Sequence, residues 1–248
     1  MKHRWRTPLM LLVPALMLLM VAAGGMPKPE PPLRGSITGK ITFDGRVPKL
    51  LPLKMENDPA CEAIAQQKKI YFGMVAVGKD RGLANVFVTI THAPEGNYPT
   101  PTEPVVIDQK DCMFAPRVVG ARVGQPVRFK NSDDILHNVH GVPQENREFN
   151  IGMPPTLKES TQTFNKPEPA FPITCEGHPW QRAYVAVMTH PYFAITADDG
   201  RFSIDDLPAG TYEVTAWHER MGTQTQTVTV GDGAATADFS FTMSGQRR

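Results

Sequence analysis

The stretch "ITCEGHPWQRAYVAV", residues 173 to 187, holds the side chains of this chain that are best suited to metal binding. Cys175 and His178 are three residues apart on a turn that contains Pro179, so a thiolate and an imidazole can point at one ion. Gln181 follows three residues later, and an apolar run comes next. The alternative is a plain turn with one buried thiol. The spacing favours a metal-binding loop that takes its remaining ligand from elsewhere in the chain.

Two upstream histidines can supply that ligand. The segment "VRFKNSDDILHNVHG" places His137 and His140 at the end of a strand-like stretch. In an extended chain these two side chains point to opposite faces, and His137 is the preferred ligand. A thiolate, two imidazoles and a weak axial Met or Gln form a blue-copper electron-transfer site. Zinc accepts similar donors but prefers closed four-ligand sets, and only one thiolate is available here. Copper is the favoured metal.

The chain has three cysteines, an odd number. In an oxidising compartment, a disulfide between Cys61 and Cys112 is the simplest expectation. It leaves Cys175 as a thiol that metal coordination would protect from oxidation. The rival expectation for Cys61 and Cys112 is a second copper site or a redox switch, but no histidine lies near them in the sequence.

The first 25 residues are typical of an export signal. A basic start with Arg4 and Arg6 precedes an apolar stretch at 9–23, and small residues suited to cleavage follow. The apolar stretch is short for a membrane span, which takes about 20 residues. An uncleaved N-terminal anchor is the alternative. We expect a proline-rich linker at 26–34 and a mature protein that is periplasmic or otherwise exported.

The rest of the chain is predicted to be all-β. Its 24 prolines and 20 glycines fall between short apolar stretches, which indicates many strands joined by turns. Helical periodicity is scarce, and "MENDPACEAIAQQ" is expected to form one or two helical turns. Phe171, Ile173 and Cys175 have the same parity, so the cysteine is expected on the inward face of a strand.

Residues 102–189 resemble a cupredoxin of the amicyanin and plastocyanin type. The segments "VGQPVRFKNSDDILHNVH" and "CEGHPWQRAYVAV" carry the resemblance, and they match the family's upstream-ligand strand and its ligand loop. It implies a Greek-key β-sandwich with one copper ion bound by His137, Cys175 and His178. It also implies that Asn138 ties the two ligand loops together and helps to hold the cysteine sulfur.

One residue departs from the family pattern. Where the family loop has methionine three residues after the histidine, this chain has Gln181. Either Gln181 binds copper axially through its amide oxygen, or the axial position is vacant. The resemblance further implies that His178 is an exposed electron port and that Pro179 and Trp180 beside it form an apolar docking patch.

The C-terminal part resembles the carboxypeptidase regulatory-like domain, a prealbumin-like β-sandwich. The resemblance rests on "DDGRFSIDDLPAGTYEVTAW". Strands of the kind that begin this family lie far upstream, in "GSITGKITFDGRVP" and "LANVFVTI". We therefore expect residues 35–101 and 190–243 to form one sandwich, with the cupredoxin domain inserted into it. The alternative assigns the N-terminal strands to the middle domain.

These expectations define an exported one-electron carrier that meets a redox partner protein transiently. The net charge of +1 gives no electrostatic basis for binding nucleic acid, and membrane contact is expected only through an uncleaved signal. The alternative is a non-catalytic surface-binding, carbohydrate-binding or structural module with a copper-binding insert. No catalytic carboxylate pair or nucleophile triad stands out, so an enzyme is not expected, and a copper redox enzyme with an open site is the remaining possibility.

Overall fold

The computed structural model describes residues 33–56 and 58–243. The expected export signal at 1–25 and most of the expected linker at 26–34 lie outside these residues. Within them the chain forms nineteen strands, one α-helix and one short 3₁₀-helix, which confirms the predicted all-β class. No helix in this part of the chain combines the length and apolar character that a membrane span requires.

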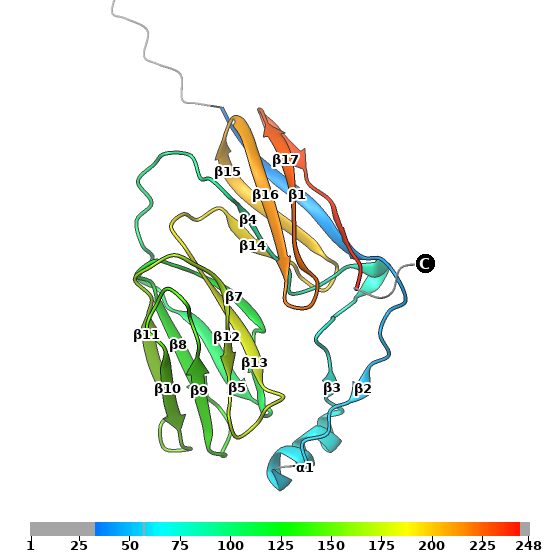
Figure 1. Cartoon of the computed structure of the whole chain (residues 1–248), viewed down its shortest axis with the longest axis vertical. Coiled ribbons are helices and arrows are strands. Elements are labelled where there is room, and N and C mark those ends of the chain that lie inside the picture. The colour runs from blue at the N-terminus through cyan, green and yellow to red at the C-terminus, as the bar shows by residue number, and fades with distance from the viewer. Residues whose placement is uncertain (1–32, 57, 244–248) are drawn as a thin grey trace, which may run out of the picture. The chain divides into compact units, whose positions relative to one another are not determined.

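Strands from both ends of the chain make one β-sandwich, here called the terminal sandwich (Figure 1). One of its sheets has the order β15-β1-β18 with β19 also paired to β1, and the other has the order β14-β4-β16-β17. The strands are β1 (Arg34–Phe43), β4 (Phe87–Ile90), β14 (Phe193–Ile195), β15 (Arg201–Pro208), β16 (Gly210–His218), β17 (Gly222–Val230), β18 (Gly233–Thr236) and β19 (Phe239–Phe241), with the 3₁₀-helix η1 (Lys79–Arg81) before β4.

Alternation of side chains along these strands explains the core of the terminal sandwich. In β16, Tyr212, Val214 and Ala216 are buried, while the residues between them face outward or are half-buried. They pack against apolar residues of the facing sheet, including Ile37 and Ile41 of β1. The period-two pattern of the sequence therefore sets which face of each strand is covered.

The turn Asp198–Asp199–Gly200 precedes β15 and ends at Gly200, where the backbone requires glycine. Gly200 has a φ of +75°, and a Cβ at this position would lie 2.1 Å from the carbonyl oxygen of Ile41. The Gly200 carbonyl accepts a hydrogen bond from the Ile41 N–H at 2.8 Å. The turn thus brings the start of β15 directly against β1.

Residues between these two groups of strands form a second β-sandwich, the middle sandwich (Figure 1). Its sheets have the orders β10-β9-β12-β13-β7 and β11-β8-β5-β6. The strands are β5 (Val105–Lys110), β6 (Met113–Ala115), β7 (Val118–Arg122), β8 (Pro126–Asn131), β9 (His137–Gly141), β10 (Phe149–Met153), β11 (Glu159–Thr163), β12 (Glu168–Thr174) and β13 (Arg182–Met188).

The core of the middle sandwich lies between its two sheets. Ile107 and Phe129 from one sheet pack with Phe171 and Ile173 from the other, and Cys175 belongs to the same cluster. Phe171, Ile173 and Cys175 are 3%, 0% and 2% exposed, so the expected inward face of this segment is confirmed. Because alternate residues at this end of β12 face inward, the Cys175 thiol lies at the end of the core.

Strand pairing supports the domain division expected from the sequence. β1 pairs with β15, β18 and β19, and β4 pairs with β14 and β16, so both N-terminal strands share sheets with the C-terminal ones. We propose on this basis that residues 35–101 and 190–243 form one domain and that 102–189 form a domain inserted into it.

A short segment between β1 and β4, residues 48–73, forms what we call the arm. Strands β2 (Leu51–Pro52) and β3 (Tyr71–Phe72) pair and lead to helix α1 (Pro59–Lys68), as Figure 1 shows. The side chain of Asp58 caps α1 by accepting hydrogen bonds from the N–H groups of Ala60 and Cys61. A proline at the first helical position suits this start. The helix buries Cys61 and Ala65.

Candidate metal centre

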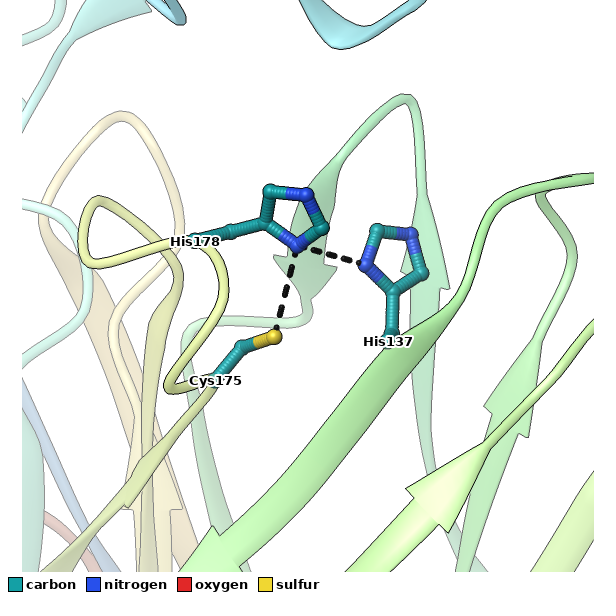
Figure 2. Close-up of side chains that lie close together, drawn as sticks. All are labelled: His137, Cys175 and His178. Atoms are coloured by element: carbon teal, nitrogen blue, oxygen red, sulfur yellow. Dashed lines mark hydrogen bonds between the residues drawn. The ribbon is translucent and has the colours of Figure 1, made fainter. Parts of the chain in front are cut away.

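The structure brings His137, Cys175 and His178 together at one end of the middle sandwich (Figure 2). His137 begins β9, Cys175 follows β12, and His178 lies in the loop 175–181, here called the ligand loop. The Nδ1 atoms of the two histidines are 3.0 Å apart, and Nδ1 of His178 is 3.4 Å from Sγ of Cys175. One sulfur and two imidazole nitrogens therefore face a common point.

Local hydrogen bonds explain why the ligand loop presents its side chains together. The His178 N–H donates to the carbonyl of Cys175 at 3.3 Å, and the Gln181 N–H donates to the carbonyl of His178 at 2.9 Å. Two consecutive turns thus fold the loop tightly. β12 pairs with β9 through Ile173 and Thr174, so the loop starts beside the first residues of β9.

The outer nitrogen of each histidine meets a carboxylate. Nε2 of His137 lies 3.0 Å from Oδ2 of Asp133, and Nε2 of His178 lies 3.3 Å from Oδ2 of Asp58. An ionised carboxylate only accepts hydrogen bonds, so each Nε2 carries the proton. Each neutral imidazole then has its lone pair on Nδ1, and two lone pairs point at each other across 3.0 Å. Only a cation between or beside these nitrogens, a proton or a metal ion, removes the repulsion.

The proton affinities follow the same geometry. Burial opposes protonation of His137, but its hydrogen bonds with Asp133 and Cys175 outweigh burial and raise the pKa of His137 to about 9. Burial lowers the pKa of His178, and the neighbouring charge of His137 acts in the same direction. In the metal-free protein at neutral pH, His137 therefore carries the extra proton and His178 is neutral.

Asn138 connects the two loops that supply the ligands. Its N–H donates to Sγ of Cys175 at 3.4 Å. Its side-chain oxygen accepts a hydrogen bond from the N–H of Glu176 at 2.8 Å and from the Cys175 thiol at 3.2 Å. The resemblance to cupredoxins implied this position for Asn138, next to both ligand segments.

Gln181 lies against the histidines but presents its nitrogen to them. The residue is fully buried, and its Nε2 is 3.2 Å from Nδ1 of His137. Its Oε1 accepts a hydrogen bond from Nε2 of Gln109 at 2.9 Å. The structure thus brings Gln181 to the site with its amide nitrogen next to His137 and its amide oxygen bonded to Gln109.

The prediction that His178 is an exposed electron port is wrong. His178 is only 3% exposed, because Asp58 and the start of α1 cover its outer edge. Trp180 does not lie in an open patch either. It is half-buried against the apolar side of the arm, and its Nε1 donates to the Cys112 carbonyl at 2.9 Å. Only Pro179 of the expected docking patch is exposed.

A disulfide fixes the arm beside the site. Cys61 of α1 and Cys112 at the turn between β5 and β6 are joined with a Cα–Cα distance of 5.7 Å. Cys175 is a free, buried thiol. Two further groupings, Asp58 with Cys61 and His178, and Cys112 with Asp133 and His137, place possible ligand atoms close together. Both need a cysteine that the disulfide occupies.

Three residues of the site escaped the sequence analysis, namely Asp58, Asp133 and Gln109. Asp58 precedes a proline and an apolar helical stretch, so its role as a helix cap could be predicted from the sequence. Its contact with His178 could not. Asp133 lies four residues before His137 in a loop, where no periodic pattern fixes its direction. His140, the weaker ligand candidate, faces away and contacts Glu148 and Glu176.

The donor set fits a copper ion. Metal–nitrogen bonds of about 2.0 Å place two nitrogens on one ion within about 4 Å of each other, and the two Nδ1 atoms are 3.0 Å apart. The Nδ1–Sγ distance of 3.4 Å is likewise short enough for both atoms to bind one ion. One thiolate with two imidazoles is the set of blue-copper sites. Among the described residues, no further His, Cys, Asp or Glu groups with this trio, whereas structural zinc sites almost always have four ligands.

Residues 174–244 match the family model of the carboxypeptidase regulatory-like domain. This confirms the resemblance of the C-terminal part to that domain. The match begins at residue 174, the last residue of β12, and it includes β13, which belongs to the middle sandwich in the structure. No curated protein matches the sequence.

Several solved structures of copper proteins are similar to part of the chain. A Cu-containing nitrite reductase from Thermus scotoductus is 20% identical over 40% of this chain, with a TM-score of 0.32, and the chain spans 25% of that enzyme. An amicyanin variant in the Cu(I) form is 23% identical over 41% of this chain and 98% of its own, with a TM-score of 0.31. A purple cupredoxin from Nitrosopumilus maritimus is 20% identical over 34% of this chain and 99% of its own, with a TM-score of 0.29.

Proposed function

We propose that this chain is an exported copper protein that transfers single electrons. One copper ion is bound by His137, Cys175 and His178, in a site of the type 1 kind. The observation that carries the proposal is the convergence of two Nδ1 atoms and one free thiol inside the protein. That arrangement costs free energy unless a cation occupies it, and the thiol makes it suited to copper.

A bound copper ion would supply the change between Cu(II) and Cu(I). The chain's own residues hold the ligands in place for both states. Asp133 and Asp58 fix the ring orientation and tautomer of the two histidines, and Asn138 donates to the sulfur. The three ligand residues lie at strand ends and in a tight turn of a packed sandwich. Little of the surrounding protein therefore rearranges when the charge of the copper ion changes.

Export is supported by the disulfide. Disulfides persist in oxidising compartments such as the bacterial periplasm, and Cys61 and Cys112 form one. The expected signal at residues 1–25 agrees with this location. The partner is a redox protein met transiently, and the net charge of +1 gives no reason to expect nucleic acid.

Copper binding is tested by adding Cu(II) to the full chain and recording the visible spectrum. An intense thiolate-to-copper charge-transfer band is expected, and Cys175→Ser should abolish it. Cys61→Ser/Cys112→Ser is the matched control and should keep the band. A band that survives in Cys175→Ser, or no band in the parent protein, contradicts the proposal.

A second candidate function is a non-catalytic binding or structural module with a copper-containing insert. The burial of His178 under Asp58 favours it, because the imidazole edge of an electron carrier needs contact with its partner. Electron exchange decides between the two. A carrier exchanges electrons rapidly with a small inorganic oxidant, whereas a structural copper ion stays in one oxidation state.

A further inference from the structure

A buried pair of amides lies on one side of the candidate centre. Gln109 is in β5, Gln181 is in the ligand loop, and both are fully buried. They are 72 positions apart in the sequence and meet through one hydrogen bond of 2.9 Å. Amide orientation decides whether the atom facing the histidines is a donor nitrogen or a ligand oxygen.

The orientation of this pair is fixed from a backbone carbonyl. The carbonyl of Asn138 can only accept, and it lies 3.2 Å from one side-chain atom of Gln109, so that atom is the nitrogen Nε2. The same Nε2 lies 2.9 Å from Gln181, which must therefore present Oε1 to it. The other amide atom of Gln181, Nε2, is then the one 3.2 Å from Nδ1 of His137.

Reversing Gln181 alone is unfavourable. It would set two NH₂ groups against each other inside the protein and leave both short of an acceptor, and unmet buried donors are costly. Reversing both amides would set the oxygen of Gln109 against the Asn138 carbonyl. The two hydrogen bonds of Gln109 therefore act together against the orientation in which Gln181 could offer its oxygen to a metal ion.

A contribution to folding stability does not explain why a glutamine occupies position 109. Its Oε1 is buried and has no hydrogen-bond partner within the described part of the chain. A buried amide with an unmet oxygen destabilises a core relative to an apolar side chain of the same shape. What the residue does provide is the two donated hydrogen bonds, and both act on groups next to the histidines.

We propose that Gln109 is a positioning residue that holds the Gln181 amide with its nitrogen toward the histidines, so that Gln181 does not ligate bound copper through oxygen. The inference rests on the proposed function. It assigns the centre three protein ligands, His137, Cys175 and His178, with Gln109 keeping the axial side free of an oxygen donor.

The test is a double-variant cycle on the copper-loaded full chain, using Gln109→Met, Gln181→Leu and the pair together. In Gln109→Met the Gln181 amide can reverse and offer its oxygen to copper as a ligand, which stabilises Cu(II). The ratio of Cu(II) to Cu(I) affinity should rise about tenfold, the size of one net buried hydrogen bond. For one electron, tenfold corresponds to a reduction potential lower by about 59 mV. The visible and electron paramagnetic resonance spectra should shift as well.

Gln181→Leu distinguishes the outcomes. In the parent background it should leave the spectra and potential nearly unchanged, and in the Gln109→Met background it should cancel the shift. If Gln181→Leu has the same large effect in both backgrounds, the oxygen already ligates copper and the proposal is wrong. No shift in Gln109→Met also overturns it. Gln125→Met removes another buried amide of the same sandwich and controls for loss of packing. Gln109→Leu serves if Gln109→Met does not fold.

A copper-free measurement separates this inference from the proposed function. In nuclear magnetic resonance spectra of the metal-free protein, the side-chain nitrogen of Gln109 should show a coupling across its hydrogen bond to the side-chain carbonyl of Gln181. The coupling should disappear in Gln181→Leu, which removes the acceptor. Absence of the coupling from the parent protein contradicts the inference. Failure of the parent protein to bind copper, with the coupling present, instead contradicts the proposed function.

Discussion

Asp58 and His178 are 120 positions apart in the sequence, yet the carboxylate of one lies 3.3 Å from the outer ring nitrogen of the other. The same carboxylate caps helix α1. The cap of helix α1 and the cover over His178 are therefore provided by the same carboxylate. Exposure of His178 to a partner depends on whether the start of α1 stays in place.

Replacing Asp58 should expose the outer edge of His178. Asp58→Ala removes the helix cap, which costs about 1 kcal/mol, and also removes the acceptor for His178. A loss of about 1 kcal/mol raises the population of the locally open form roughly fivefold. Electron exchange of the copper-loaded protein with hexacyanoferrate should accelerate by a similar factor. Asp58→Asn, which keeps a good cap and an acceptor oxygen, should exchange at close to the parent rate. Equal rates for all three proteins would show that the arm does not limit access.

The disulfide should contribute strongly to stability. It closes a loop with a sequence separation of 51. In the chain-entropy model a loop of this size is worth about 4 kcal/mol. Cys61→Ser/Cys112→Ser should therefore lower the free energy of unfolding of the copper-free protein by about that amount in urea titrations. Cys175→Ser leaves the disulfide intact and should change it far less. A double-serine protein as stable as the parent would contradict the estimate.

Two glycines of the β9–β10 pair should respond differently to alanine. A Cβ at Gly141 would lie 2.3 Å from Cε1 of Phe149, whereas a Cβ at Gly152 has nothing within 4 Å. Gly141→Ala should cost about 1–3 kcal/mol, because a packed ring must move. Gly152→Ala should stay within about 0.5 kcal/mol of the parent. Thermal and urea unfolding of the copper-free protein measure both, and a reversed order would show that Phe149 is free to move.

Arg117 and Glu219 join the two sandwiches through a partly buried ion pair with two hydrogen bonds. Nη2 of Arg117 donates to Oε2 of Glu219 at 2.9 Å, Nε donates to the other oxygen, and the side chains are 15% and 3% exposed. Glu219→Ala leaves a buried charge alone and should cost about 3–5 kcal/mol. Arg117→Met/Glu219→Met should recover most of this loss. The exposed pair Arg128 and Glu159 is the control, and Glu159→Ala should cost at most about 1 kcal/mol. A small loss in Glu219→Ala would mean that water reaches Arg117.

Burial should make His218 a source of acid sensitivity. Burial, reinforced by nearby Arg117 and Arg220 against the charge of Glu219, lowers the pKa of His218 to about 4, from 6.5 for an ordinary histidine. The unfolded chain therefore binds a proton that the folded chain does not. The stability from the neutral ring is fully present above about pH 6.5 and is lost as the pH falls toward 4, by about 3 kcal/mol.

The comparison protein for this effect is His218→Gln, which keeps an acceptor for the Arg220 N–H and does not titrate. Urea unfolding of both copper-free proteins at pH 7, 5 and 4 isolates the contribution of His218 from that of the other titrating groups. The parent protein should lose about 3 kcal/mol more than the variant between pH 7 and pH 4. Parallel losses would show that His218 has an ordinary pKa in the folded protein.

Strands that cover one face with alternating apolar side chains were predictable. β16 shows this most clearly, and β12 shows it from Phe171 onward, since their buried residues follow the parity of the sequence. The ligand loop was predictable for a related reason. Cys175 and His178 are close in sequence, so one tight turn brings them together, and the odd number of cysteines singles out a free thiol.

The environment of the centre depended on contacts that no local pattern encodes. Asp58 reaches His178 from the arm, and Gln109 reaches Gln181 from β5. Whether Gln181 can offer its oxygen to a metal ion depends on which end of its amide faces the histidines, and that orientation depends on the hydrogen bonds of Gln109 to Gln181 and to the Asn138 carbonyl. The exposure of His178 was predicted wrongly because the covering residues are far away in the sequence.

The sequence by itself determined the all-β class, the close placement of Cys175 and His178 in one loop and the covered face of strands such as β16, because these follow from side-chain type and short-range periodicity. The tertiary structure alone decided what surrounds the loop. Burial of His178, the carboxylates behind both imidazoles and the orientation of the Gln181 amide all arise where segments distant in the chain pack together. Packing and hydrogen bonding between distant segments depend on their three-dimensional positions, which the spacing of residues along the chain does not specify.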